Sequence, residues 1–212
     1  MKIIQISLLS GVRSKTVLRS VDFSNKTCVA RVLHLGAGRQ SSTIAEMSAN
    51  GDLPPLDFAI FADTKNEPPW VYEQVEYLKT RLPVVVVEKS AGGIVDDTKR
   101  GVGRLASMPL FTRDVAGNVG RLRRQCTNEY KIEIIENYLR DWLIERDYGK
   151  IAKDGTRRIS KEIYIEGWFG ISWDEIERLS DRSGPWQKDI YPLVDRRMGL
   201  EQCISYLRSG GH

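Results

Sequence analysis

Three short apolar runs, separated by stretches with the spacing of helices, constrain the fold of this chain more than any other feature. The runs lie at Val32–Leu35, Phe58–Thr64 and Leu82–Glu88, and the stretch Pro68–Leu78 between the last two is spaced as a helix that opens with proline. The third run is branched and nearly uncharged, as is typical of a strand buried on both faces. This alternation predicts an α/β fold, a parallel twisted sheet with helices on both faces in a Rossmann-like, three-layer arrangement.

The turn after the first run is small and rich in hydroxyl groups. It reads Gly36-Ala-Gly-Arg-Gln-Ser-Ser-Thr43 and continues into the amphipathic segment Ile44–Met47. Its small residues would let the backbone approach a ligand closely, and its hydroxyls and free N–H groups would stand at a helix N-terminus, where an anion is favoured. In parallel sheets, ligands bind beyond the carboxyl ends of the strands, so this turn and the pair Asp63-Thr64 would share one edge. We therefore predict a ligand that carries phosphate.

These segments resemble those of a known family. The turn Gly36–Ser42 resembles the Ser-Gly-Gly-x-Asp-Ser-Thr loop of the PP-loop ATP pyrophosphatases, and Phe61–Pro69 resembles the Asp-Thr segment of the phosphoadenosine phosphosulfate (PAPS) reductase family. Cys126–Lys131, Gly170–Arg178 and Tyr191–Asp195 resemble later blocks of that family, in the same order, with Ile134, Ser172 and Ile176 as departures. The likeness runs from about residue 30 to residue 211 and is closest to small PAPS reductase-like proteins often encoded by phages and mobile elements.

The resemblance implies a domain organisation and a set of site residues. Residues 30–212 would form a nucleotide-binding domain of the adenine nucleotide alpha-hydrolase-like type, and residues 1–29 an N-terminal extension that we expect to contribute a short edge strand. The residues expected to bind ATP or PAPS are Gly36, Ala37, Gly38, Arg39, Gln40, Ser41, Ser42, Asp63, Thr64 and Arg124. The residues expected to take part in catalysis are Ser41, Cys126, Lys131 and Arg178.

Three functions remain open at this level. The first is an enzyme that uses ATP to adenylate an oxygen of a nucleic acid or metabolite, for modification or thiolation, with release of pyrophosphate. Magnesium would assist that cleavage, but Gln40 stands where the ATP pyrophosphatases carry an aspartate and cannot bind the ion as a carboxylate would. The second is PAPS reductase-type chemistry through the Cys126 thiolate, and the third is a nucleotide or nucleic-acid binding protein without catalysis.

Composition limits the partners and cofactors. The three cysteines lie far apart, so we do not expect an iron–sulfur cluster held within one chain, and with only two histidines we predict no metal site. A net charge of +4 is compatible with anionic ligands, and the arginine-rich segment 91–124 could close over phosphates or contact a nucleic-acid backbone. The longest apolar runs are too short to span a membrane, so we expect a soluble cytoplasmic protein, with homo-oligomerisation left open.

Overall fold

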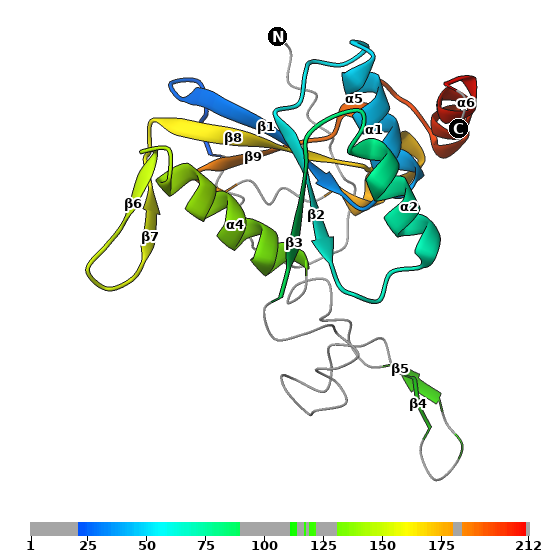
Figure 1. The fold of residues 1–212 in the computed structure, drawn as a ribbon, viewed down its shortest axis with the longest axis horizontal. Coiled ribbons are helices and arrows are strands. Elements are labelled where there is room, and N and C mark those ends of the chain that lie inside the picture. Colours follow the sequence, from blue (N-terminus) through cyan, green and yellow to red (C-terminus); the bar gives the residue numbers. More distant parts are fainter. Residues whose placement is uncertain are drawn as a thin grey trace, which may run out of the picture.

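A parallel sheet forms the centre of the protein (Figure 1). The structure is a computed structural model, and it describes residues 21–89, 111–113, 117, 119–121, 131–179 and 184–210. Within these, the central sheet has five strands in the order β3-β2-β1-β8-β9, and all neighbours are parallel. The strands span Thr27–Leu35 (β1), Phe58–Asp63 (β2), Val84–Glu88 (β3), Ile163–Phe169 (β8) and Gln187–Ile190 (β9).

Helices cover both faces of this sheet, so the fold has three layers. Alternate strand residues point to opposite faces, which divides the core in two. On one face, Leu33 and Phe61 pack against the helices α1 (Arg39–Ala49), α2 (Pro69–Leu78), α5 (Pro192–Asp195) and α6 (Leu200–Ser209). On the other face, Val32 and Ile60 pack against α4 (Glu133–Ile144), whose Leu139 and Leu143 are fully buried. The expected α/β fold with a parallel sheet and helices on both faces is confirmed.

The order of the strands contains a reversal beside β1. The chain runs outward from β1 through β2 to β3, then returns to place β8 on the other side of β1 and continues to β9. In open α/β sheets such a reversal is the topological switch point, and the crevice outside the carboxyl ends of the two strands is where ligands bind. The sheet order therefore places the expected binding edge between the end of β1 and the end of β8.

The remaining described elements are short. β4 (Phe111–Arg113) pairs with β5 (Val119–Arg121), and β6 (Gly149–Ile151) pairs with β7 (Arg157–Ile159), both in antiparallel register. The sequence patterns did not predict either pair. A 3-10 helix, η3 (Trp173–Arg178), follows β8. No helix in the described ranges combines the length and the apolarity needed to cross a membrane.

β1 begins earlier than the sequence resemblance begins. Thr27 and Cys28 already pair with β8, so residues 27–29 of the expected extension belong to the middle of the sheet. The edge strand expected near the start of the chain lies outside the described residues. A π-type turn at Lys131 and Ile132 directly precedes α4.

Candidate nucleotide site at the carboxyl edge of the sheet

The turn after β1 is only three residues long. α1 begins at Arg39, and Gly38 is its N-cap with an extended backbone. Ala37 is buried and adopts a φ of 51°, the left-handed conformation that an L-residue rarely takes. Gly36 and Gly38 do not have positive φ, so the left-handed position of this turn is occupied by its alanine rather than by a glycine.

The hydroxyl groups of this segment lie within the helix rather than before it. Ser41 Oγ donates to the Gly38 carbonyl at 3.2 Å, and Thr43 Oγ1 donates to the Arg39 carbonyl at 2.8 Å. Such bonds to the preceding turn satisfy serine and threonine inside a helix, which is why the helix begins before them. Ser41, expected at the catalytic step, therefore has its hydroxyl occupied by the backbone of its own turn.

A pocket lies at the N-terminus of α1. It encloses about 410 Å³ and is lined by the turn, the first residues of α1, the start of α2 and the end of α6: Ala37, Gly38, Arg39, Ser42, Trp70, Gln74 and Leu207. Ser42 is 3% exposed, and its Oγ has no hydrogen-bond partner within the described residues. The N-cap of α1 is Gly38, which has no side chain to accept from the first turn, so the N–H groups of that turn have no intrahelical acceptors. The Ser42 hydroxyl and the first N–H groups of α1 are therefore unsatisfied hydrogen-bonding groups at one end of the pocket.

The loop after β8 packs directly against the start of α1. A Cβ placed on Gly170 would lie 2.7 Å from the Ser41 nitrogen and 2.9 Å from its Cα. Only glycine allows the two backbones to come this close. This contact joins the two loops on either side of the switch point.

Two expected site residues, Gln40 and Arg178, both contact Glu175, which the sequence did not single out. Gln40 Nε2 donates to Glu175 Oε2 at 3.2 Å, and Arg178 Nη1 lies 2.6 Å from Glu175 Oε1. Glu175 stands three residues before Arg178 on η3, a spacing that brings side chains together on a helix. We call residues 36–42, Gly170, Glu175 and Arg178 the switch-point group.

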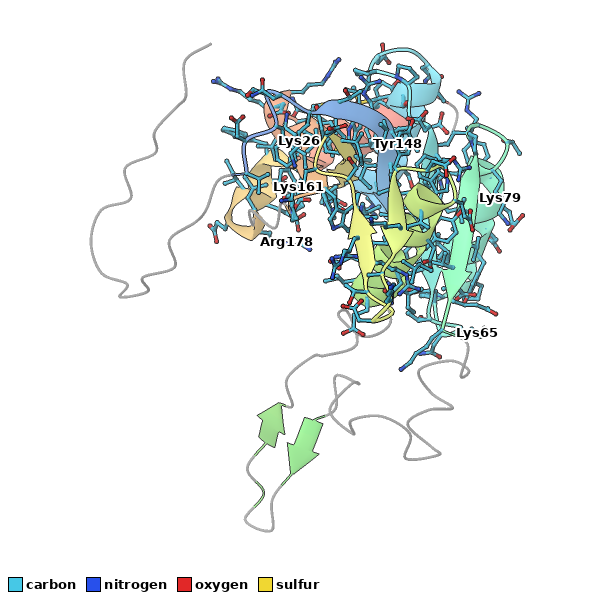
Figure 2. The ribbon with its side chains drawn as sticks, turned by 90° about the vertical axis from the view of Figure 1, so that its left-hand side faces the viewer. Lys26, Lys65, Lys79, Tyr148, Lys161 and Arg178 are labelled. Carbon is cyan, nitrogen blue, oxygen red and sulfur yellow. The ribbon has the colours of Figure 1, made fainter. Side chains whose placement is uncertain are left out.

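Asp63, Thr64 and Lys131 belong to a different set of contacts, at the end of β2. Asp63 Oδ1 accepts from Tyr72 Oη at 2.9 Å and from the Lys65 nitrogen at 2.7 Å. Glu67 Oε1 accepts from Thr64 Oγ1 at 3.1 Å and from Lys131 Nζ at 2.8 Å. We call these five side chains, Asp63, Thr64, Glu67, Tyr72 and Lys131, the β2 group. Figure 2 shows Lys65, which follows Thr64, well apart from Arg178.

His34 forms part of the sheet surface beneath the switch point. Its ring stacks on Phe169, with centroids 4.3 Å apart and planes inclined by 26°. Its Nε2 is buried and has no hydrogen-bond partner in the part of the chain that is described. Burial lowers the pKa of His34 from 6.5 to about 4, so the ring is neutral at physiological pH.

The thiols that the structure describes are not activated. Burial raises the pKa of Cys28 and of Cys203 above their ordinary value, which disfavours the thiolate. Cys126 and Arg124 lie outside the described residues, as does most of the arginine-rich segment 91–124. Among the described residues, no group of three His, Cys, Asp or Glu side chains is placed to hold a metal ion.

No protein-family model and no curated protein matches the chain. The functional interpretation therefore rests on the residues and on the geometry of the two groups at the carboxyl edge.

Proposed function

We propose that the protein binds an adenine nucleotide with its phosphates at the N-terminus of α1, in the manner of the PP-loop and PAPS reductase-like proteins that its sequence resembles. The observation that carries this proposal is the buried Ser42 hydroxyl, which lacks a partner within the described chain and belongs to a residue lining the pocket. A buried polar group without a partner costs about 1–3 kcal/mol. A phosphate oxygen, together with the uncapped N–H groups of α1, would remove that cost.

The charge around the turn supports an anionic ligand. Arg39 begins α1, lines the pocket and is exposed, and it has no ion-pair partner among the residues described. Arg178 reaches the same region through Glu175, which in turn holds Gln40 beside the loop. A guanidinium group can bind two phosphate oxygens at once, so these arginines would orient the polyphosphate chain.

The opposite wall of the pocket suits a purine. Trp70 is 58% exposed, an unusual exposure for an indole, and Gln74 lies one turn further along α2 on the same wall. An exposed indole face can stack on a base, and a glutamine amide can hydrogen-bond to the base edge. In this arrangement the base lies against α2. The side chains of Asp63 and Thr64, which the resemblance places at the adenosine, instead form hydrogen bonds within the β2 group.

The reaction that best fits this binding mode is adenylation. An oxygen of the acceptor attacks the α-phosphorus of ATP, the bond to the bridging oxygen breaks, pyrophosphate leaves and the acceptor proton passes to solvent. Preorganised donors at a helix N-terminus stabilise the charge that develops on the leaving pyrophosphate. PAPS reductase-type chemistry would instead require the Cys126 thiolate, which lies outside the described residues.

Calorimetric titration tests the proposal, with ATP, PAPS and inorganic tripolyphosphate as ligands and with and without magnesium. We expect ATP to bind, and we expect Ser42→Ala to weaken binding of both ATP and tripolyphosphate by roughly tenfold, because a hydrogen bond to a charged group is lost. Trp70→Ala should weaken ATP binding by several-fold and leave tripolyphosphate binding unchanged, because only the base contact is removed.

A matched variant separates binding from folding. Ser48 lies two turns further along α1, where its Oγ donates to the Pro54 carbonyl and accepts from the Leu56 nitrogen. Ser48→Ala should lower thermal stability and leave nucleotide affinity intact. Nucleotide binding that is absent from the wild-type protein, or that is insensitive to Ser42→Ala, would overturn the proposal.

A further inference from the structure

The groups at the α1 end of the pocket favour an anion and disfavour a cation. Arg39 is exposed there without an ion-pair partner among the described residues, and the first N–H groups of α1 have no intrahelical acceptors. The helix dipole adds a partial positive charge at the same end. The Ser42 hydroxyl, which has no partner within the described chain, can also donate to an anion. The phosphates of a nucleotide would therefore meet donors and positive charge on this side.

The same pocket offers little to a metal ion. The described residues that line it carry one positive charge and no carboxylate: Ala37, Gly38, Arg39, Ser42, Trp70, Gln74 and Leu207. In nucleotide sites magnesium is usually bound by one or two carboxylates together with the phosphates. The Arg39 guanidinium and the dipole of α1 would also repel the ion. The chemistry of this donor set does not fit a magnesium ion.

Glu175 brings a carboxylate close to the loop, but both of its oxygens have partners. Oε2 accepts from Gln40 Nε2 at 3.2 Å, and Oε1 pairs with Arg178 Nη1 at 2.6 Å. Arg178 neutralises this carboxylate, and a magnesium ion bound to Glu175 would stand beside a guanidinium group of the same sign. Neither Glu175 nor Gln40 belongs to the pocket lining that the structure describes. The magnesium that the resemblance to the ATP pyrophosphatases implies therefore has no free carboxylate to bind among these described residues.

We propose that the pocket binds its nucleotide in the magnesium-free form, and that magnesium weakens this binding. The proposal rests on the proposed nucleotide site and specifies the ionic form of the ligand. Magnesium cancels part of the negative charge of a polyphosphate. It also occupies oxygens that the Arg39 guanidinium and the N–H groups of α1 would otherwise bind. Magnesium in solution thus competes with the protein for the same phosphate oxygens.

Calorimetric titration of the full chain with inorganic tripolyphosphate and with ATP tests the proposal. Each ligand is measured in a chelating buffer and in excess magnesium chloride. Potassium chloride keeps the ionic strength equal, because salt screens charge. Both ligands should bind the wild-type protein several-fold more tightly without magnesium. Equal or tighter binding with magnesium would overturn the proposal.

A charge series at Arg39 tests which group sets the preference. Without magnesium, affinity should fall from the wild-type protein to Arg39→Gln and again to Arg39→Glu, because the first change removes an attraction and the second adds a repulsion. Arg39→Glu should bind more tightly with magnesium than without it, because its carboxylate can bind the metal that the phosphates carry. The fold should tolerate this change, since Arg39 is exposed and an acidic residue is favourable in the first turn of a helix. An unchanged preference for the metal-free ligand in Arg39→Glu would contradict the proposal.

Arg158→Glu is the matched control. Arg158 is exposed on β7, which packs beside α4 on the other face of the sheet from α1. The substitution changes the net charge of the chain by the same amount as Arg39→Glu. It should leave both affinities and their ratio nearly unchanged. Equal effects of the two substitutions would mean that the net charge of the protein, and not the pocket, sets the preference, and the proposal would fail.

Glu175→Gln tests whether Glu175 instead binds the metal. The variant should keep the preference for the magnesium-free ligand, and a loss of binding in excess magnesium alone would contradict the proposal. The titrations also separate this inference from the proposed function. Binding that appears only with magnesium would refute this inference and leave the nucleotide site in place. Absence of binding of either ligand under both conditions would refute both.

Discussion

The switch-point group and the β2 group lie on the same edge of the sheet but differ in how their polar atoms are satisfied. In the β2 group, Asp63, Thr64 and Lys131 all have partners, with Glu67 bonded to two of them. In the switch-point group, Ser42 Oγ has no partner among described residues and no side chain caps α1. A closed polar network stabilises the fold, whereas buried groups without partners cost free energy until a ligand arrives. We therefore expect ligand binding at the switch point and a structural role for the β2 group.

Of the changes proposed here, Gly170→Ala in the switch-point group should have the largest effect on stability and on ATP affinity. The new methyl group would lie 2.7 Å from the Ser41 nitrogen, and main chain cannot rotate away as a side chain could. We expect the free energy of unfolding to fall by roughly 3 kcal/mol or more. We also expect ATP affinity to fall at least tenfold, because the first turn of α1 must move.

Chemical denaturation and calorimetry measure the two effects. Gly184→Ala is the control, because no heavy atom of the described residues lies within 4 Å of a Cβ at that position. Wild-type stability in Gly170→Ala would show that the two loops are not in fixed contact.

The next largest effect concerns pH and the sheet beneath the switch point. His34 has a pKa of about 4 in the folded protein and 6.5 as its ordinary value, so below pH 6.5 the unfolded chain binds a proton that the folded chain does not. The contribution of neutral His34 is complete above pH 6.5 and is lost as the pH falls towards 4. The loss is on the order of 2–3 kcal/mol.

Urea denaturation of the wild-type protein and of His34→Gln isolates the contribution of His34 to stability. The measurements run from about pH 7 to about pH 4, a range around the ordinary histidine pKa. The difference in unfolding free energy between the two proteins should shift in favour of the variant as the pH falls. A constant difference would show that folding does not shift the pKa of His34.

A smaller effect is expected from the β2 group. A double-mutant cycle with Glu67→Gln and Lys131→Met should give a coupling of about 0.5–1 kcal/mol, because the pair is partly exposed and its attraction is screened. ATP affinity should change less than twofold in each variant. If Lys131→Met abolished ATP binding or pyrophosphate release at unchanged stability, Lys131 would belong to the site and the comparison would be reversed.

The smallest effect is expected at Ala37. Ala37→Gly relieves the left-handed strain of the turn but makes the unfolded chain more flexible, so the net change should be a stabilisation of less than about 1 kcal/mol. Ala45→Gly, in the interior of α1, should instead destabilise by about 1 kcal/mol or more. Thermal denaturation shows whether each substitution raises or lowers the stability of the protein. Destabilisation by Ala37→Gly would mean that packing of the alanine methyl group stabilises the fold by more than the left-handed backbone strain costs.

Local patterns predicted the elements of the sheet better than their ends. The apolar runs correctly identified β1, β2 and β3, and the proline-led stretch identified α2, because periodicity over a few residues reports which faces are buried. The start of α1 was placed too late, because Ser41 and Thr43 bond to carbonyls of their own helix instead of standing before it. The hairpin of β6 and β7 was missed because its strands have only three residues each and too little alternation to detect.

By itself, the sequence determined an α/β chain with a small, hydroxyl-rich turn after its first strand, because strand and helix periods and turn chemistry are local properties. The tertiary structure alone decided that β8 lies beside β1, that Gly170 packs on Ser41 and that Glu175 joins Gln40 to Arg178. It also decided that the Ser42 hydroxyl has no partner in the described chain, while Lys131 is paired with Glu67. These contacts join residues far apart in the sequence, and whether a polar group is satisfied depends on everything packed around it.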